Sequence, residues 1–285
     1  MTRLFLVMTG TVAALAVAVP VGAQGKGKVH KSTPPSSLAL PSPAVTATAT
    51  AGALPFAWID DASVLAPGDL SFSIAALLWQ GTDLHEVDVP VVGVALGLAK
   101  RVQIGASLPR VVGSTDPSGV AGGLGTTFVS GKVSVLTGAR TGVKLAVAPT
   151  FEILGERALQ SAAPGQSRTQ FGLPVSLEID RGGARVFGSG GYFSGGTWFA
   201  GGGVGSQLGS RVAVSMAFSR AWTTDPTAAL VHDRREVSGG AAWSLKPRIS
   251  LFGSVGRSIA TADADGAGTT ITGGVLFLLK PAVGK

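Results

Sequence analysis

The sequence predicts an all-β chain, and within that class a transmembrane, antiparallel up-and-down β-barrel of about twelve strands. Three observations lead to this prediction. Apolar residues alternate with small or polar ones over many short segments, glycine is abundant while charge is scarce, and the amino terminus has the features of an export signal. Strands that are apolar on one face, in an exported chain, are typical of the outer membrane of a Gram-negative-type cell envelope.

The alternation is clearest in residues 143 to 153 and 171 to 179. Apolar residues occupy the odd positions there, and small or polar residues occupy most of the even positions. A period of two is that of a β-strand, whose successive side chains point to opposite faces of the sheet. We therefore expect the odd positions in these segments to face lipid and the even positions to face the barrel lumen.

Composition favours one barrel domain over residues 69 to 279. The 285 residues include 42 glycines, and 45% are hydrophobic but only 14% charged, whereas about a quarter of the residues of a soluble protein are charged. No window beyond residue 19 reaches the roughly 18 uninterrupted apolar residues of a membrane helix. The apolar residues are therefore dispersed in strand-sized segments, and a single barrel can use more than about 200 residues as one domain.

Residues 1 to 23 are predicted to be a cleaved signal peptide. Arg3 provides the positive start, residues 4 to 19 the apolar core, and Val21-Gly22-Ala23 the small-residue cleavage site. The alternative, a membrane anchor, would be short for a span. The chain has no cysteine, which excludes a lipoprotein attachment site and a disulfide framework.

Residues 24 to 68 are predicted to form a periplasmic linker or a plug. Their first part is rich in proline, alanine, serine and threonine and begins with the basic residues Lys26, Lys28 and Lys31. Such a segment cannot bury a core of its own, so an extended chain is expected. It could remain solvated, contact the cell wall or an anionic surface, or enter the barrel.

Twelve strands can be assigned from the alternation and the turn residues between them, and most are long enough to cross a bilayer at a tilt. The predicted strands are 69 to 79, 87 to 99, 102 to 112, 121 to 136, 142 to 154, 168 to 180, 185 to 193, 197 to 207, 211 to 222, 234 to 245, 248 to 260 and 268 to 279. With residues 280 to 285 as a periplasmic tail, both chain ends lie in the periplasm, which requires an even number of strands. Ten or fourteen strands remain alternatives.

The connections alternate between short turns and longer loops, except at 194 to 196, as in barrels with short periplasmic turns and long outer loops. Basic residues gather at the short turns and the adjacent strand starts: Lys100, Arg101, Arg140, Arg181, Arg185, Arg211, Lys246 and Arg248. Acidic residues gather in the longer loops: Asp83, Glu86, Asp116, Glu156, Asp225, Asp233, Asp263 and Asp265. We expect a basic periplasmic rim and an outer rim of mixed charge that carries the acids.

Aromatic residues fall near the predicted strand ends, as the interfacial girdles of a membrane barrel do. The predicted outer girdle consists of Trp79, Tyr192, Phe193, Trp198 and Trp222, and the inner one of Trp243 and Phe277.

The predicted inward face supplies the candidate functional residues. On neighbouring antiparallel strands, Lys144 is expected opposite Glu178, and Glu152 opposite Gln170, where opposite charges would pair across the sheet. The candidate lumen-lining residues are Lys132, Lys144, Glu152, Gln170, Glu178 and Glu236. They could form a structural salt-bridge network or contact a solute. Most other inward residues are too small to fill a twelve-stranded lumen, which should therefore hold water, a plug or a ligand.

The sequence gives little support for catalysis or a cofactor. Asp83-Leu84-His85 and His232-Asp233 could provide a general base, but their loops are not adjacent and no nucleophile motif accompanies them. With three histidines and no cysteine, no metal site or other cofactor is expected. The positive residues are spread over turns and tail, so nucleic acid is not an expected partner. The expected partners are outer-membrane lipids and lipopolysaccharide.

Three segments resemble one family of outer-membrane barrels. Leu65-Ala66-Pro67-Gly68-Asp69-Leu70, the hairpin from Val94 to Gly105, and the stretch from Gly122 to Lys132 are similar to the entry, a hairpin and a glycine-led strand of the transporter-like barrels named for the MetA pathway of phenol degradation. The resemblance implies transport of apolar solutes, and it carries no substrate site with it.

The last predicted strand resembles a more general signal. Residues 272 to 279 are similar to the β-signal through which the barrel-assembly machinery recognises its clients, which makes that machinery an expected partner. Residues 280 to 285 follow here, whereas most bacterial clients end on an aromatic residue.

The resulting expectation is a passive channel or transporter for small solutes, which the family resemblance suggests are apolar. The alternative is a non-conducting structural or surface barrel whose lumen is closed by side chains and the tail. The identity of the solute is not predicted.

Overall fold

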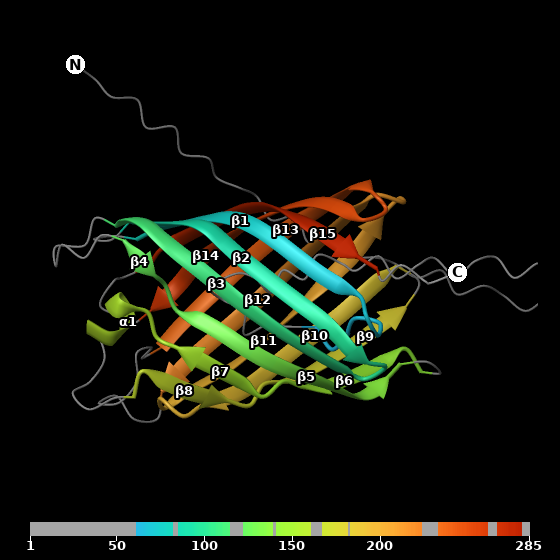
Figure 1. Cartoon of the computed structure of the whole chain (residues 1–285), viewed down its shortest axis with the longest axis horizontal. Helices are drawn as coiled ribbons and strands as arrows, with labels where there is room; N and C mark the ends of the chain where they lie inside the picture. Colours follow the sequence, from blue (N-terminus) through green and yellow to red (C-terminus); the bar gives the residue numbers. More distant parts are fainter. Residues whose placement is uncertain are drawn as a thin grey trace, which may run out of the picture. The chain divides into compact units, whose positions relative to one another are not determined.

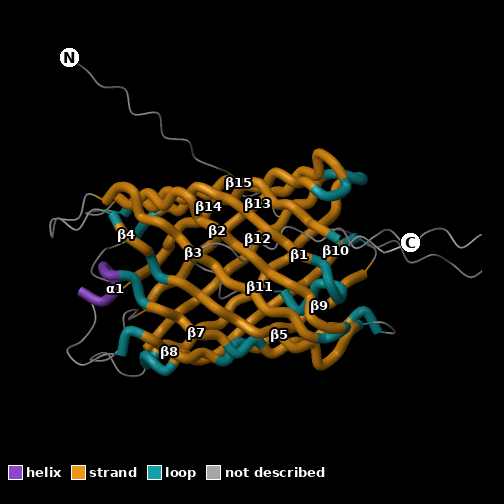
Figure 2. The backbone as a smooth tube through the Cα atoms, viewed as in Figure 1, coloured by secondary structure: helices purple, strands orange, loops and turns teal. Residues whose placement is uncertain are grey.

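The computed structural model describes residues 61–81, 85–114, 122–138, 141–160, 167–181, 183–223, 233–261 and 267–280. These residues form one antiparallel sheet that closes into a barrel (Figures 1 and 2). The first strand, β1 (Leu70–Gln80), pairs with β2 (His85–Ala99) and with the last strand, β15 (Thr269–Leu279). Closure leaves no free sheet edge, as a sheet in lipid requires. The predicted signal peptide, residues 24 to 60 and the tail from 281 lie outside the described residues.

Fifteen strand elements make up twelve strands of the wall, because three pairs of short elements continue one another. These pairs are β4 (Gly123–Leu124) with β5 (Thr127–Thr137), β6 (Val143–Val147) with β7 (Thr150–Ile153), and β8 (Thr169–Gly172) with β9 (Val175–Arg181). The other strands are β3 (Val102–Ser114), β10 (Ala184–Phe193), β11 (Thr197–Leu208), β12 (Val212–Thr223), β13 (Asp233–Lys246) and β14 (Ile249–Thr261). The prediction of a twelve-stranded antiparallel barrel is confirmed.

Two predicted strands are interrupted at proline. Pro149 separates β6 from β7, and Pro174 separates β8 from β9, because proline has no N–H group to donate to the neighbouring strand. Hydrogen bonding continues around the gaps: the Ala148 N–H donates to the Pro174 carbonyl at 2.8 Å, and the Gly131 N–H donates to the Pro149 carbonyl at 2.9 Å. The interruptions therefore bend the wall without opening it.

The loop predicted at 155 to 167 begins with a short helix, α1 (Glu156–Gln160), which the alternation did not indicate. It lies at the end of the barrel opposite the Lys100-Arg101 turn (Figure 1). Among the described residues, no helix is both long and apolar enough to cross a membrane.

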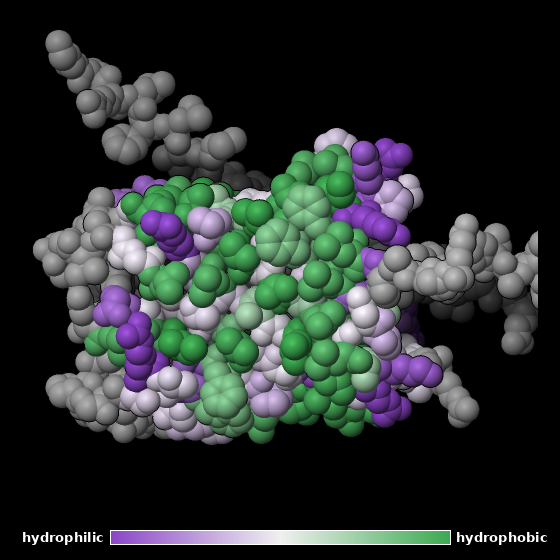
Figure 3. Space-filling model, viewed as in Figure 1, coloured by the Kyte–Doolittle hydropathy of each residue, from purple (hydrophilic) through white to green (hydrophobic). Residues whose placement is uncertain are grey.

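The two faces of the wall differ as the alternation predicted. On β8 and β9, Phe171, Val175 and Leu177 are exposed, whereas Ser176 and Glu178 are buried. Large apolar side chains cover much of the outer surface in the view of Figure 3. An exposed apolar surface of this extent is suited to contact with lipid hydrocarbon.

The two rims also agree with the charge pattern where they are described. Lys100, Arg101, Arg211 and Arg248 are exposed at short turns. At the other end, Glu156 pairs with Arg168 at 2.9 Å, and Asp233 pairs with Arg220 at 3.0 Å. Six of the predicted rim residues lie outside the described residues: Asp83, Asp116, Arg140, Asp225, Asp263 and Asp265.

Two predicted girdle residues face inward instead. Tyr192, Trp198 and Trp243 are exposed on the outer face as expected, but Trp79 and Phe193 are buried on the inner face. The reason is their phase in the strand, because Trp79 shares the face of the buried Ala75 and Leu77. Position near a strand end was the basis of the prediction, and it does not determine which face a residue occupies.

Inward-facing aromatic rings lie against glycines of neighbouring strands. A Cβ atom at Gly203 on β11 would lie 2.7 Å from the ring of Phe187 on β10, and one at Gly191 on β10 would lie 3.0 Å from the ring of Phe199 on β11. The ring of Phe193 covers Gly172 in the same way. Glycine thus gives these rings space to lie along the inner wall.

Candidate functional site in the barrel interior

The cross-strand pairs predicted from the sequence are present. Lys144 on β6 is directly opposite Glu178 on β9, and Glu152 on β7 is directly opposite Gln170 on β8. The face shared by these residues is the one opposite the exposed apolar side chains, because the strand places alternate residues on opposite sides. The two pairs lie near opposite ends of the same part of the wall.

Lys144 and Glu178 form a close ion pair that a third residue joins. The Lys144 Nζ atom lies 2.9 Å from Glu178 Oε1. The hydroxyl of Ser63 donates to Glu178 Oε2 at 3.0 Å and accepts a hydrogen bond from Lys144 Nζ at 3.0 Å. The Glu178 side chain is 2% exposed, so these contacts balance a carboxylate that is withdrawn from water.

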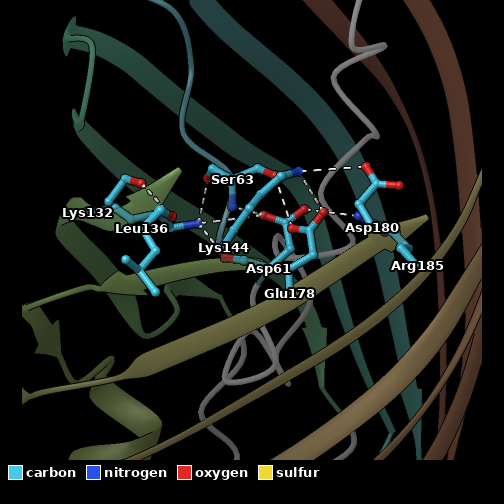
Figure 4. Close-up of polar contacts among 9 residues, drawn as sticks. Asp61, Ser63, Lys132, Leu136, Lys144, Glu178, Asp180 and Arg185 are labelled. Atoms are coloured by element: carbon cyan, nitrogen blue, oxygen red, sulfur yellow. Dashed lines mark hydrogen bonds and ion pairs between the residues drawn. The ribbon is translucent and has the colours of Figure 1, made fainter. Parts of the chain in front are cut away.

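A second ion cluster lies beside the first and centres on Asp61. Its carboxylate accepts a hydrogen bond from Arg185 Nη1 at 3.1 Å and lies 3.9 Å from Lys132 Nζ. Lys132 also donates to the backbone carbonyls of Asp61 at 3.1 Å and Ser63 at 3.4 Å. Figure 4 shows these side chains converging inside the ring of strands. We call Asp61, Ser63, Lys132, Lys144, Glu178 and Arg185 the inner network.

The chain segment that carries Asp61 and Ser63 follows the inner wall until β1 begins. The Leu65 N–H donates to Gln103 Oε1 at 2.9 Å, and the Gly68 N–H donates to the Gly97 carbonyl at 2.7 Å. The Ala66 carbonyl occupies the space that a side chain at position 97 would need. Gly97 therefore allows residues 65 and 66 to pass directly over β2.

The inner network includes three residues that the sequence analysis did not select. Asp61 and Ser63 belong to the segment predicted as linker or plug, and Arg185 was assigned to the basic rim. Arg185 does lie at the start of β10, but its side chain is only 16% exposed and pairs with Asp61 inside the barrel. A signal for Asp61 was present, since Asp60 and Asp61 are the first acidic residues of the chain and follow a basic tail.

Three of the six predicted residues lie away from the network. Glu152 and Gln170 pair further along the same strands, and Glu236 lies on β13 across the barrel. Glu236 is 3% exposed, and its Oε2 atom has no hydrogen-bond partner among the described residues. The structure therefore divides the predicted set between two regions of the wall.

Two arcs of the wall differ in their inward residues. We call β5, β6, β9 and β10 the tied arc, because they carry the wall residues of the inner network. We call β11 to β15 the small-residue arc, because its inward positions are mostly glycine, alanine, serine and threonine. Examples of its inward residues are Gly203, Ser215, Ala217, Ser219, Ser238, Gly240, Ser254, Thr270 and Thr272.

The residues considered for catalysis do not form a site in the described part of the chain. His85 begins β2, whereas Asp83, Leu84 and His232 lie outside the described residues. No group of three or more His, Cys, Asp or Glu side chains within the described ranges could hold a metal ion. The chemistry that the described interior offers is ion pairing and hydrogen bonding.

Two solved structures of similar fold are outer-membrane channels. The COG4313 outer membrane channel from Pseudomonas putida F1 is similar with a TM-score of 0.58 and 12% sequence identity, covering 77% of this chain and 98% of that one. The KdgM porin in complex with disordered oligogalacturonate is similar with a TM-score of 0.52 and 9% identity, covering 73% of this chain and 98% of that one. These likenesses show that the fold is that of an outer-membrane β-barrel.

The sequence matches no protein-family model and none of the curated proteins. The resemblance to the phenol-degradation barrels therefore remains a prediction from the three segments that carry it.

Proposed function

We propose that this protein is an outer-membrane channel or transporter that lets small solutes pass passively through its lumen. The observation that carries the proposal is the contrast between the two arcs of a closed wall. The tied arc binds the segment that precedes β1 through the ion pairs of Lys132 and Arg185 with Asp61, and the small-residue arc offers short polar side chains. Short side chains cannot reach across a twelve-stranded barrel, so the side chains of the described residues leave room for solutes beside the bound segment.

The bound segment acts as a partial plug in this proposal. Asp61, Ser63 and Leu65 each hydrogen-bond to a side chain of the wall, so residues 61 to 65 narrow the lumen on one side. The interactions are polar and reversible, which allows the segment to move when a solute passes.

Apolar solutes are the more specific part of the proposal. The family resemblance suggested them, and inward rings such as Trp79, Phe193 and Phe199 support them. Each ring lies on the inner face near glycine, alanine or serine residues, so an apolar solute would find contact surface along the wall.

A non-conducting structural barrel is the second candidate, and the same inner network favours it if the segment never moves. Planar-bilayer recordings distinguish the two functions. We expect single-channel conductance from the full chain, and a larger conductance from a variant that lacks residues 24 to 64 but keeps the contacts of residues 65 to 68 with β2 and β3. Silence of both proteins, in preparations shown to be folded and inserted, would favour the structural barrel.

We propose no enzymatic activity. His85→Ala should leave conductance unchanged, because His85 is exposed at the start of β2. A change in hydrolysis of added ester or peptide substrates on His85 replacement would contradict this.

Lipids and the assembly machinery are the proposed partners. The apolar outer face fits lipid hydrocarbon, and exposed Lys100, Arg101, Arg211 and Arg248 fit anionic headgroups at the periplasmic rim. The outer rim would contact lipopolysaccharide, and β15 would be the strand read by the barrel-assembly machinery. Measuring how fast the protein inserts into vesicles with and without the barrel-assembly machinery tests the partnership with that machinery.

A further inference from the structure

We infer that Lys132 and Arg185 form a binding site for the carboxylate of a solute, and that Asp61 occupies this site in the structure as an internal substitute. The inference rests on the proposed channel function and names the class of solute that the tied arc would recognise. That class is a small carboxylate with an apolar body.

The Asp61 carboxylate is bound as a ligand would be. One oxygen, Oδ2, accepts a hydrogen bond from Arg185 Nη1 at 3.1 Å. The other, Oδ1, accepts from the Ser63 N–H at 3.1 Å and lies 3.9 Å from Lys132 Nζ. The two cations come from different strands, β5 and β10, so the site belongs to the wall and Asp61 belongs to a segment that enters it.

The charges of the wall leave this site positive when Asp61 is removed. Among the described residues, the wall contributes three cations, Lys132, Lys144 and Arg185, and two carboxylates. Glu178 lies 2.9 Å from Lys144, and the half-exposed Asp180 lies 3.8 Å from Lys144 and opposite Arg185 in the sheet. Three positive and two negative charges leave one net positive charge. Without Asp61, the pair Lys132 and Arg185 would therefore attract an anion from the lumen, as rings of basic side chains do in anion-selective pores.

Arg185 is held in position by more than Asp61. Its guanidinium lies over the ring of Phe187 at 5.0 Å from the centroid, and its Nε atom would be 2.8 Å from a side chain at position 205, where the chain has glycine. Contact with the ring and the space above Gly205 both come from the wall. The cation is thus presented in the same place whether or not the segment is bound, and preorganisation of this kind favours ligand binding.

The surroundings of Arg185 suggest the body of the ligand. The Phe187 ring and Gly203 form an apolar surface directly beside the guanidinium. A carboxylate attached to an aromatic or aliphatic group would pair with the two cations and place its body against this surface. Such a solute would have the apolar body proposed above and, in addition, one negatively charged group.

Because Asp61 is part of the same chain, it competes with the solute at a high effective concentration. Removal of its charge should therefore raise the apparent affinity for a free carboxylate. This is the property that separates an internal substitute from a purely structural ion pair.

The binding test uses the full chain in detergent micelles, with benzoate and its neutral analogue benzamide as probes. In Asp61→Asn, benzoate should raise the melting temperature and bind about tenfold or more tightly than in the wild type, whereas benzamide should have no effect on either protein. Adding Arg185→Gln to the Asp61→Asn variant should abolish benzoate binding. Glu156→Gln, which removes the same charge from the exposed helix α1, should behave as the wild type.

Ion selectivity gives a second readout in planar bilayers. Reversal potentials in a KCl gradient should show Asp61→Asn shifted toward anions by about fivefold in permeability ratio, and Arg185→Gln on the wild-type background shifted toward cations. Arg181→Gln, at the exposed end of β9, should change the ratio little. The opposite signs keep the inference testable even if one of the two variants fails to fold.

The outcomes separate the site from the channel. Equal benzoate affinity in the wild type and Asp61→Asn, or binding that survives Arg185→Gln, would overturn the carboxylate site even if every variant conducts. Benzoate binding in a protein that never conducts would support the site and contradict the proposed function.

Discussion

The tied arc and the small-residue arc follow the same alternation of side chains but reach different solutions on the inner face. In the tied arc, inward positions carry Lys132, Lys144, Glu178 and Arg185, and each pairs with a charge of opposite sign. In the small-residue arc, most inward positions are glycine, alanine, serine or threonine, and Glu236 is the buried acid of its inner face.

The difference shows that two separate factors act on the inner face. The alternation of the strand determines which side chains point inward, and the presence of a pairing segment determines whether those side chains can be charged. Withdrawing a charge from water costs several kcal/mol unless a partner compensates. Charges gather in the arc where a chain segment enters to pair with them. Small side chains remain along the arc that the described segment does not contact.

The largest expected effect comes from breaking the pairing of the tied arc. Glu178→Gln should lower the free energy of unfolding by about 3 to 5 kcal/mol, because it leaves the largely buried Lys144 without its close carboxylate. Guanidinium unfolding in detergent micelles, followed by tryptophan fluorescence, would measure the loss.

Asp180→Asn is the matched control for this prediction. Asp180 also lies near Lys144, at 3.8 Å, but its side chain is 49% exposed. Exposed ion pairs contribute about 0 to 1 kcal/mol, so this variant should differ little from the wild type. If Glu178→Gln and Asp180→Asn lowered the free energy of unfolding equally, burial would not determine how much each carboxylate contributes to stability.

Much of this arc could be predicted from the sequence because its determinants are local. Strand period is encoded within a few positions, and the alternation on the two strands places Lys144 and Glu178 on the same face, where the register makes them neighbours. The candidate residues could therefore be selected in pairs.

The part that could not be predicted depends on contacts between distant segments. Ser63 meets Glu178 across 115 positions of sequence, and no local pattern marks a linker residue as the partner of a strand. Arg185 lies beside a turn and therefore resembles a rim residue in the sequence. Only the structure shows that its side chain points inward and pairs with Asp61. Pro149 and Pro174 were visible, but the hydrogen bonds that carry the sheet around them arise from neighbouring strands.

The next prediction tests the outer face of the small-residue arc. Met216 is exposed in the middle of β12, and its neighbour Ser215 faces inward among small residues. Met216→Arg should cost about 2 to 4 kcal/mol, because it places a charge in lipid near the bilayer midplane. Ser215→Arg should cost much less and should mainly reduce conductance. Unfolding in lipid vesicles measures the stability losses, and planar-bilayer recording measures the conductance. Equal stability losses in the two variants would contradict the assignment of the outward and inward faces in this arc.

A smaller effect is expected where an aromatic ring of the tied arc lies over a glycine. A methyl group at Gly172 would collide with the ring of Phe193, so Gly172→Ala should cost about 1 to 3 kcal/mol through overpacking. Gly131→Ala is the control, because a Cβ atom there meets nothing within 4 Å. It should be neutral or slightly stabilising, since alanine loses less backbone entropy than glycine in a strand. Equal losses of stability in the two variants would mean that the Phe193 ring does not need the space that glycine leaves at position 172.

The smallest expected effect lies at the junction of the two arcs, where Tyr192 on β10 packs against Trp198 on β11 with ring centroids 4.9 Å apart. Both rings are on the outer face, so they join the arcs without depending on what the lumen contains. A double-mutant cycle with Tyr192→Leu and Trp198→Leu should give a coupling of about 0.5 to 1.5 kcal/mol. The pair Phe151 and Phe171, with centroids 5.5 Å apart inside the first half of the wall, provides the comparison. Similar couplings would show that the arcs form one continuous wall toward lipid and differ only toward the lumen, whereas a coupling near zero at Tyr192 and Trp198 would identify the junction as a weak seam.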